Sequence, residues 1–200
     1  MAFEVPFEIP PEDSIASFDF FDLASGSAYK TLYAADTTGG VEILTPVPIY
    51  SDSGSEGGNG QSSEFSIIFN LPLQMSGKCY LYIPAFYESP LGTQTITLGI
   101  TPTIKKNGVA IVAGAQKSLA RSTTLGTNLQ SVFSWALTIP TTTLAKDDIL
   151  SLLVEISVSQ STGTTLSGIN FDPKDRNINV AASEFITSQL VMIVPFIPDI

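Results

Sequence analysis

The acidic side chains are the groups in this sequence that could do chemistry, because its 200 residues include no histidine and only one cysteine. Without imidazole or a thiol pair there is no Ser-His-Asp triad, no Cys-His pair and no zinc site of the usual ligands. Two carboxylates suffice for glycoside hydrolysis, and the candidates are Glu155, Asp172, Asp175 and Glu184. A strand-face carboxylate is more often solvated, and Trp135 falls on a predicted core face, away from a sugar site. The sequence therefore predicts that the protein is not an enzyme.

A glycine-rich acidic stretch, SDSGSEGGNGQSS at 51–63, offers oxygen ligands of the kind that calcium prefers. The candidate ligands are Asp52, Glu56 and Asn59. Their spacing does not fit a twelve-residue EF-hand loop, and no helix follows the glycines, as a phosphate-binding loop would require. The composition favours a flexible acidic loop. The sequence thus predicts no cofactor, with calcium in this loop as the alternative.

The stretch KCYLYIPAF contains the single cysteine, Cys79, on the same face of a predicted strand as its aliphatic neighbours. This position predicts a buried, unreactive thiol, and a chain without disulfides fits synthesis in a reducing cytosol. Tyr80 and Tyr82 fall on the opposite face. Together with Tyr87 they are the candidates for an exposed aromatic face, which suits a glycan, a receptor or another subunit.

Alternation of apolar and polar residues runs through most of the chain and predicts strands with one buried face. Strands are predicted at 28–35, 41–50, 64–71, 78–87, 93–105, 108–113, 116–124, 130–139, 149–158, 164–171 and 186–194. Asn107-Gly108 predicts a type I′ hairpin turn, and residues 12–25 predict a short helix. Because no longer helical periodicity occurs, the predicted fold class is all-β: an antiparallel β-sandwich, in the form of a jelly roll.

The first twelve residues, MAFEVPFEIPPE, have the pattern of an extended arm. Four apolar side chains share one edge of it: Phe3, Val5, Phe7 and Ile9. Its prolines lack N–H groups and bar the segment from the centre of a sheet. The apolar edge needs a cover, from the domain's own core or from a neighbouring subunit. The predicted organisation is an arm at 1–12 and a single β-sandwich domain at 13–200.

The charge balance is strongly acidic, with 19 Asp and Glu against 9 Lys and Arg and a net charge of −10. Such a field disfavours nucleic acid and anionic membranes as partners. The N-terminal residues lack the positive charge of a signal peptide, and the longest apolar run, LVMIVPFIP, is short of the roughly 20 residues that span a bilayer. We therefore expect neither nucleic acid nor a membrane as a partner.

Three short motifs in the last third to half of the chain resemble small β-rich structural proteins of tailed bacteriophages and related viruses. Lys146-Asp147-Asp148 stands where such proteins often have Lys-Gly-Asp, and Asp172-Pro173 matches a following loop. Val194-Pro195-Phe196 matches a closing strand. The resemblance implies a jelly-roll virion component, such as a capsid decoration or cement protein, a spike or a fibre head.

The composition agrees with that implication, since serine and threonine are plentiful, charges are few and catalytic side chains are missing. The predicted function is a virus or phage structural protein that oligomerises and docks on other capsid or tail proteins. By analogy with similar virion proteins we expect a homotrimer, located in the virion after synthesis in the host cytoplasm. The alternative is a carbohydrate- or receptor-binding β-sandwich module.

Overall fold

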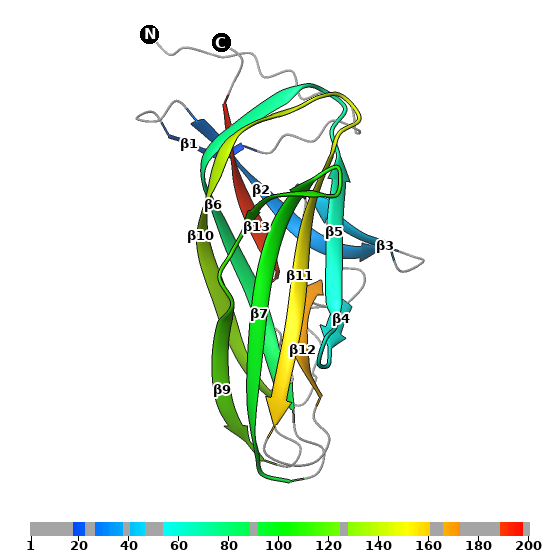
Figure 1. The fold of residues 1–200 in the computed structure, drawn as a ribbon, viewed down its shortest axis with the longest axis vertical. Coiled ribbons are helices and arrows are strands. Elements are labelled where there is room, and N and C mark those ends of the chain that lie inside the picture. The colour runs from blue at the N-terminus through cyan, green and yellow to red at the C-terminus, as the bar shows by residue number, and fades with distance from the viewer. Residues whose placement is uncertain are drawn as a thin grey trace.

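A computed structural model describes residues 18–22, 27–37, 41–46, 54–88, 92–124, 128–160, 166–172 and 189–197 (Figure 1). Its strands are β1 Phe18–Asp22, β2 Ser27–Thr37, β3 Val41–Thr45, β4 Gly54–Gly57, β5 Ser62–Ile68, β6 Leu73–Glu88, β7 Gln94–Lys106, β8 Val109–Ala113, β9 Lys117–Thr123, β10 Asn128–Leu144, β11 Ile149–Gln160, β12 Leu166–Asp172 and β13 Val191–Ile197. These ranges contain no helix, and so none that could cross a membrane.

The strands pair in a nested order, in which each pair lies inside the previous pair along the chain. β2 pairs with β13, β4 with β12, β5 with β11, β6 with β10, and β7 with β9. Wrapping an antiparallel hairpin into two layers produces this nesting, which is the topology of a jelly roll. Among the described strands, each pair is antiparallel except β3 with β5. The all-β, antiparallel prediction is confirmed.

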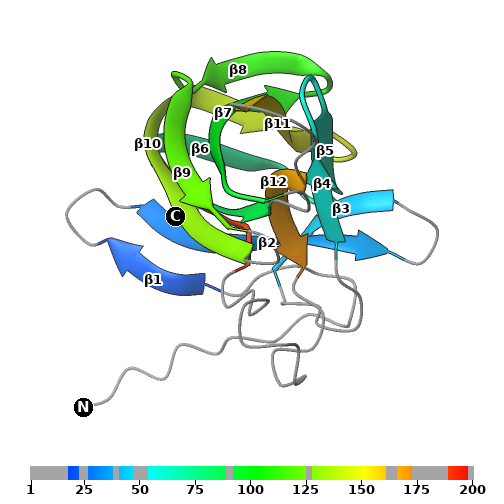
Figure 2. The ribbon, with the colours of Figure 1, turned by 90° about the horizontal axis from the view of Figure 1, so that it is seen from below.

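The nested strands form two layers that enclose the core (Figure 2). One layer contains β12, β6, β10, β13 and β2, and the other contains β5, β11 and β7 with β8 and β9. Strand alternation sends Leu81 and Ile83 into the core from the first layer and Leu152 from the second, and all three are fully buried. Each such side chain stabilises the fold by roughly 1.5–3 kcal/mol. Phe65 and Phe171 meet edge to face across the layers, with ring centroids 4.9 Å apart.

Side chains close the side of the sandwich between β10 and β9. The Trp135 indole N–H donates to the carbonyl oxygen of Ala115 at 2.9 Å, and the Lys117 ammonium donates to the carbonyl oxygen of Ser134. Lys117 also lies 5.3 Å from the centroid of the Trp135 ring. Gly114 makes this closure possible, because a Cβ there would lie 2.8 Å from Trp135 Cδ1. The free edge of β10 is therefore partly blocked against pairing with another strand.

The predicted strands are all present, with shifted ends. β10 continues to Leu144, beyond the predicted end, because an irregularity in its pairing with β6 between Ile139 and Thr142 accommodates Pro140. β13 runs later than predicted and includes Pro195, at a similar irregularity opposite β6. The Asn107-Gly108 turn is confirmed, since both residues have positive φ, 49° and 79°.

Two predictions were wrong. Residues 18–22, within the predicted short helix, form β1, because pairing with β2 sets Phe20 opposite Tyr29 and Phe21 opposite Ala28. Residues 54–57, within the predicted flexible loop, form β4, because β12 supplies a partner across the sheet. In both cases a distant strand decides the structure and local composition does not.

Other predictions fall outside the described residues. They concern the apolar arm residues Phe3, Val5, Phe7 and Ile9, the domain boundary after residue 12, and the acids Asp52, Asp175 and Glu184. Glu56 and Asp172 are placed by their backbones alone, in β4 and β12.

Candidate functional site

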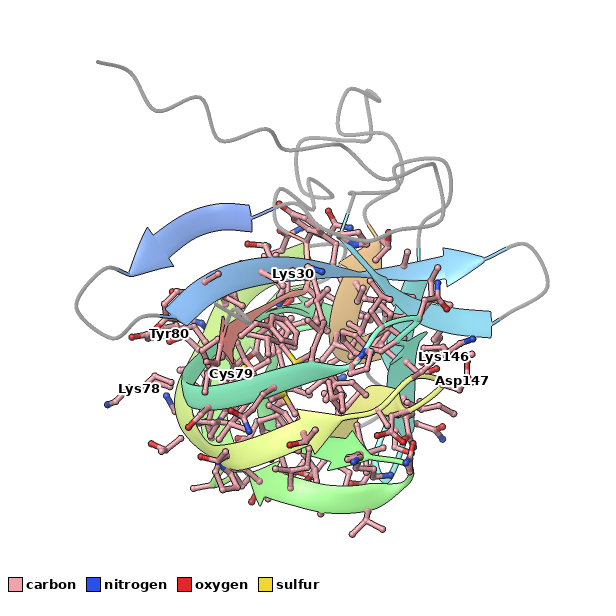
Figure 3. The ribbon with its side chains drawn as sticks, turned by 90° about the horizontal axis from the view of Figure 1, so that it is seen from above. Lys30, Lys78, Cys79, Tyr80, Lys146 and Asp147 are labelled. Atoms are coloured by element: carbon pink, nitrogen blue, oxygen red, sulfur yellow. The ribbon has the colours of Figure 1, made fainter. Side chains whose placement is uncertain are left out.

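The outer face of β6 carries the tyrosines that the sequence predicted to be exposed. Cys79 points inward and is fully buried, whereas Tyr80 is half-buried and Tyr82 is 41% exposed. Figure 3 places Tyr80 and Lys78 at the outer surface of the molecule, on the side opposite Lys146. Period-two alternation along the strand thus separates the thiol from the tyrosines, as predicted.

Neighbouring strands extend this face with more uncharged side chains. On β13, Val191 lies opposite Tyr82 and Ile193 lies opposite Tyr80. Tyr33 of β2 follows opposite Val191, and on β10 Val132 stands 53% exposed, diagonal to Tyr82. We call this surface the tyrosine face and define it as Tyr33, Tyr80, Tyr82, Val132, Val191 and Ile193. Cross-strand pairing brings together residues from four strands that are far apart in the sequence.

Tyr87 does not belong to the tyrosine face. It lies an odd number of residues from Tyr82 on the same strand, so it points inward and is fully buried. Its hydroxyl donates to the carbonyl oxygen of Leu119 at 3.4 Å. Burial raises the pKa of this hydroxyl, and a hydrogen bond with Ser131 and the nearby Arg121 charge oppose that rise. The prediction of Tyr87 as part of an exposed binding face is corrected by its burial.

Glu155 is the candidate catalytic acid whose side chain the structure describes. It is exposed on the outer face of β11 and lines a groove of about 320 Å³. Among the described residues that line this groove, the other side chains are polar, apart from Ile156, and Glu155 is the one carboxylate. Glycoside hydrolysis by the usual route needs two.

The Lys146-Asp147-Asp148 motif of the predicted resemblance forms a rigid turn. The Asp148 carboxylate accepts hydrogen bonds from the Asn107 amide at 2.6 Å, from Lys106 at 2.9 Å and from the Ala145 backbone N–H at 2.7 Å. Asn107 in return accepts from the backbone N–H of Ile149 at 2.8 Å. The bonds from Asn107, Lys106 and Ala145 lower the pKa of Asp148 to about 2. The motif locks two neighbouring turns together, which is a structural role.

The calcium prediction is tested in part by Asn59. The Oδ1 atom of Asn59 accepts a hydrogen bond from the backbone N–H of Val158 at 3.1 Å, so this oxygen already has a structural partner. Within the described ranges no three acidic or cysteine side chains gather as metal ligands do. The contribution of Asp52 and Glu56 stays a prediction.

The thiol of Cys79 is buried in the core as predicted. Burial raises its pKa to about 12, because the low-polarity surroundings disfavour the thiolate. Trp135, 6% exposed, also lies in the core and stacks on Phe133 with ring centroids 6.1 Å apart. Neither side chain forms part of a surface site.

No protein-family model and no curated protein matches this chain. Among solved structures, one of a CocE/NonD family hydrolase from Staphylococcus aureus is similar, with 11% identity and a TM-score of 0.55 over 92% of this chain and 38% of the hydrolase. A second structure of a hydrolase of this family from S. aureus has 10% identity and a TM-score of 0.53, over 86% and 37%. The chain thus spans little more than a third of the proteins it matches. At this identity the likeness shows a shared β-sandwich fold alone.

A structure of infectious bursal disease virus, Gx strain, also aligns with 92% of this chain and 40% of its own, at 13% identity and a TM-score of 0.35. That score is too low to support an argument about fold or function.

Proposed function

We propose that the protein is a structural β-sandwich protein that assembles with copies of itself through the tyrosine face. The observation that carries this proposal is the face itself: six uncharged side chains on four neighbouring strands, with Tyr82 41% and Val132 53% exposed. Tyrosine is enriched in protein interfaces because it offers a large apolar ring and a polar hydroxyl. A surface of this kind favours a protein partner.

Electrostatics favour a second copy as that partner. Each chain carries a net charge of −10, so two copies repel one another across most of their surfaces. Contact between copies needs a surface from which carboxylates are missing, and none of the six side chains is charged. A contact across a two-fold axis buries the same patch on both subunits, whereas a ring can set this face against a different surface of the next copy.

The outer edge of β10 favours a face contact over strand addition. Lys117 donates to the carbonyl oxygen of Ser134 on this edge, and the indole of Trp135 on β10 donates to the carbonyl oxygen of Ala115. Pairing of another strand along β10 would have to displace these groups. The broad outer face stays accessible without such a rearrangement.

The second part of the proposal is that the oligomer belongs to a virion. It is supported by the resemblance of the Lys146-Asp147-Asp148, Asp172-Pro173 and Val194-Pro195-Phe196 motifs, and by the jelly-roll pairing of the strands. We propose a closed homo-oligomer, a trimer by that resemblance, that docks on capsid or tail proteins. The arm at 1–12 would supply a further contact to a neighbouring subunit.

Charge placed on the tyrosine face tests the assembly. In Tyr82→Glu each subunit brings a carboxylate into the contact, and we expect the oligomer to dissociate to the 21.3 kDa chain in light-scattering measurements. Ser159→Glu is the matched control, since it adds the same charge to an exposed position on β11, in the other layer. A wild-type protein that is monomeric at every concentration, or a Tyr82→Glu protein that keeps its oligomeric mass, would overturn the proposal.

The alternative, a carbohydrate- or receptor-binding module, uses the exposed Tyr80 and Tyr82 rings as a stacking platform. A third variant, Tyr82→Ala, separates the two interpretations. If Tyr82→Ala abolishes binding on a glycan array while the mass of the protein is unchanged, the tyrosine face binds a glycan and is not a subunit interface.

A further inference from the structure

A second surface lies in the other layer of the sandwich, on the outer faces of β5, β11 and β7. It is a groove of about 320 Å³, close to the lower end of the range of small-ligand sites. We call it the Glu155 groove. Its lining consists of Gly60, Gln61, Ser62, Thr101, Gln116, Glu155, Ile156 and Ser157. Six of these eight residues have side chains that can form hydrogen bonds.

One wall of the groove is a turn that is fixed to β11 by hydrogen bonds. The N–H of Gly60 donates to the carbonyl oxygen of Ile156 at 3.0 Å. The N–H of Ile156 in turn donates to the carbonyl oxygen of Gln61 at 2.9 Å. The N–H of Gly58 also donates to the carbonyl oxygen of Ser167 at 2.9 Å. The wall is therefore held in place before any ligand arrives, which lowers the entropic cost of binding.

A glycine, Gly99, lies beside the groove, opposite the lining residue Ser157. A Cβ at Gly99 would lie 2.7 Å from Gln116 Nε2 and still closer to the Ser157 hydroxyl. Because this position has no side chain, Gln116 can donate to the Ser157 hydroxyl at 2.8 Å directly above the strand. Ser118, opposite Gly99 on β9, brings a third polar group to the same place. Polar groups thus converge over Gly99.

Glu155 is the charged group of the groove. Strand pairing places it between Ser62 of β5 and Thr101 of β7. In the described part of the chain no lysine or arginine pairs with it, whereas the nearby Glu64 is paired with Lys105 at 2.9 Å. The carboxylate of Glu155 is therefore available as a hydrogen-bond acceptor for a ligand.

We infer that the Glu155 groove is a binding site for a neutral saccharide of one or two sugar units. The single carboxylate and the acidic net charge disfavour an anion, and the described residues lack the several carboxylates of a calcium site. An amine would use only acceptors and leave the amide donors of Gln61 without a partner in the ligand. Sugar hydroxyls both donate and accept, and so match the mixture of carboxylate, amide and hydroxyl groups.

The binding is expected to be weak, with a dissociation constant of about 1 mM, because exposed hydrogen bonds exchange with water and none of the described residues that line the groove is aromatic. Two-dimensional ¹H–¹⁵N spectra of the full chain suit this range. We would titrate methyl glycosides of glucose, galactose, mannose and N-acetylglucosamine. At least one should shift the backbone signals of residues 60–62, 99–101 and 155–157 and saturate.

Two variants and two other ligands make the test specific. Glu155→Ala should weaken binding at least 10-fold, whereas Glu64→Ala removes a carboxylate from the same layer outside the groove and should leave affinity unchanged. The inference is overturned if no glycoside shifts these signals at 100 mM, or if Glu155→Ala binds normally. It is also overturned if calcium chloride or ethanolamine shifts the groove signals and the glycosides do not. Tyr82→Glu should bind the glycoside normally, so this result is independent of the assembly test.

Discussion

Lys30 offers a test of how the layers of the sandwich are built, because it is a lysine in a place that suits an apolar residue. Its side chain lies on β2, is 4% exposed and has its ammonium 5.6 Å from the centroid of the Phe196 ring. Desolvation by burial lowers its pKa from 10.5 to about 8. Burial therefore disfavours the charged form of this lysine in the folded state.

The magnitude follows from the pKa values. A difference of one pKa unit is about 1.36 kcal/mol, so the fall from 10.5 to about 8 corresponds to roughly 3 kcal/mol between the charged and the neutral form of the lysine. We expect the free energy of unfolding of the wild type to rise by about this amount relative to that of Lys30→Met as the pH rises from 7 to 10.5.

The two pKa values also fix the direction in which the stability of the wild type relative to Lys30→Met changes with pH. Below about pH 8 the lysine is charged in both the folded and unfolded states, and the penalty is constant. Between about pH 8 and 10.5 the folded state releases the proton that the unfolded state keeps, so the wild type gains stability relative to the variant as pH rises. The stability of the wild type relative to Lys30→Met should therefore rise over this window.

Urea unfolding at one fixed protein concentration, at several values between pH 7 and 10.5, measures this difference. Lys146→Met is the control, because it removes an exposed lysine in a turn and should change stability by no more than about 0.5 kcal/mol. A Lys30→Met protein whose stability relative to the wild type does not change between pH 7 and 10.5 would refute the reasoning.

Three further predictions concern the closure, the turn and the arm. Gly114→Ala should destabilise the fold by about 1–3 kcal/mol in urea unfolding, because the added Cβ would lie 2.8 Å from Trp135 Cδ1; equal stability would show that the closure is loose. Asp148→Asn should remove the stability that the wild type has above about pH 4 and loses as pH falls toward 2, and an unchanged acid-unfolding curve would contradict the role of the turn. Deleting residues 1–11 should leave a folded β domain, by circular dichroism, that no longer assembles; failure to fold would show that the arm belongs to its own core, and normal assembly that the arm is dispensable.

The sequence predicts the features that depend on a single strand or turn, such as which side chains of a strand point inward. Alternation placed Cys79 inside and Tyr80 outside, and Asn107-Gly108 fixed the position of a hairpin turn. The same parity would have put Tyr87 inside, since it lies five residues from Tyr82. The burial of Tyr87 was therefore predictable from the alternation of this strand.

What could not be predicted depends on which strands become neighbours. Val191 and Tyr33 join Tyr82 because β13 lies between β2 and β6, and no local pattern encodes that order. The strand at 54–57 has a glycine-rich sequence and exists because β12 supplies its partner. The Glu155 groove arises in the same way, from a turn, three strands and a connection that meet only in the folded chain.

Hydroxyl-radical footprinting of the unmodified protein at increasing concentration tests the proposed assembly most directly. Tyr82 is 41% exposed in the single chain, and Leu71, at 67%, lies after β5 and outside the tyrosine face. Assembly through that face predicts that the oxidation rate of Tyr82 falls several-fold as the mass rises above 21.3 kDa, while the rate of Leu71 stays the same. A mass that rises while Tyr82 is oxidised as fast as in the monomer would contradict the account.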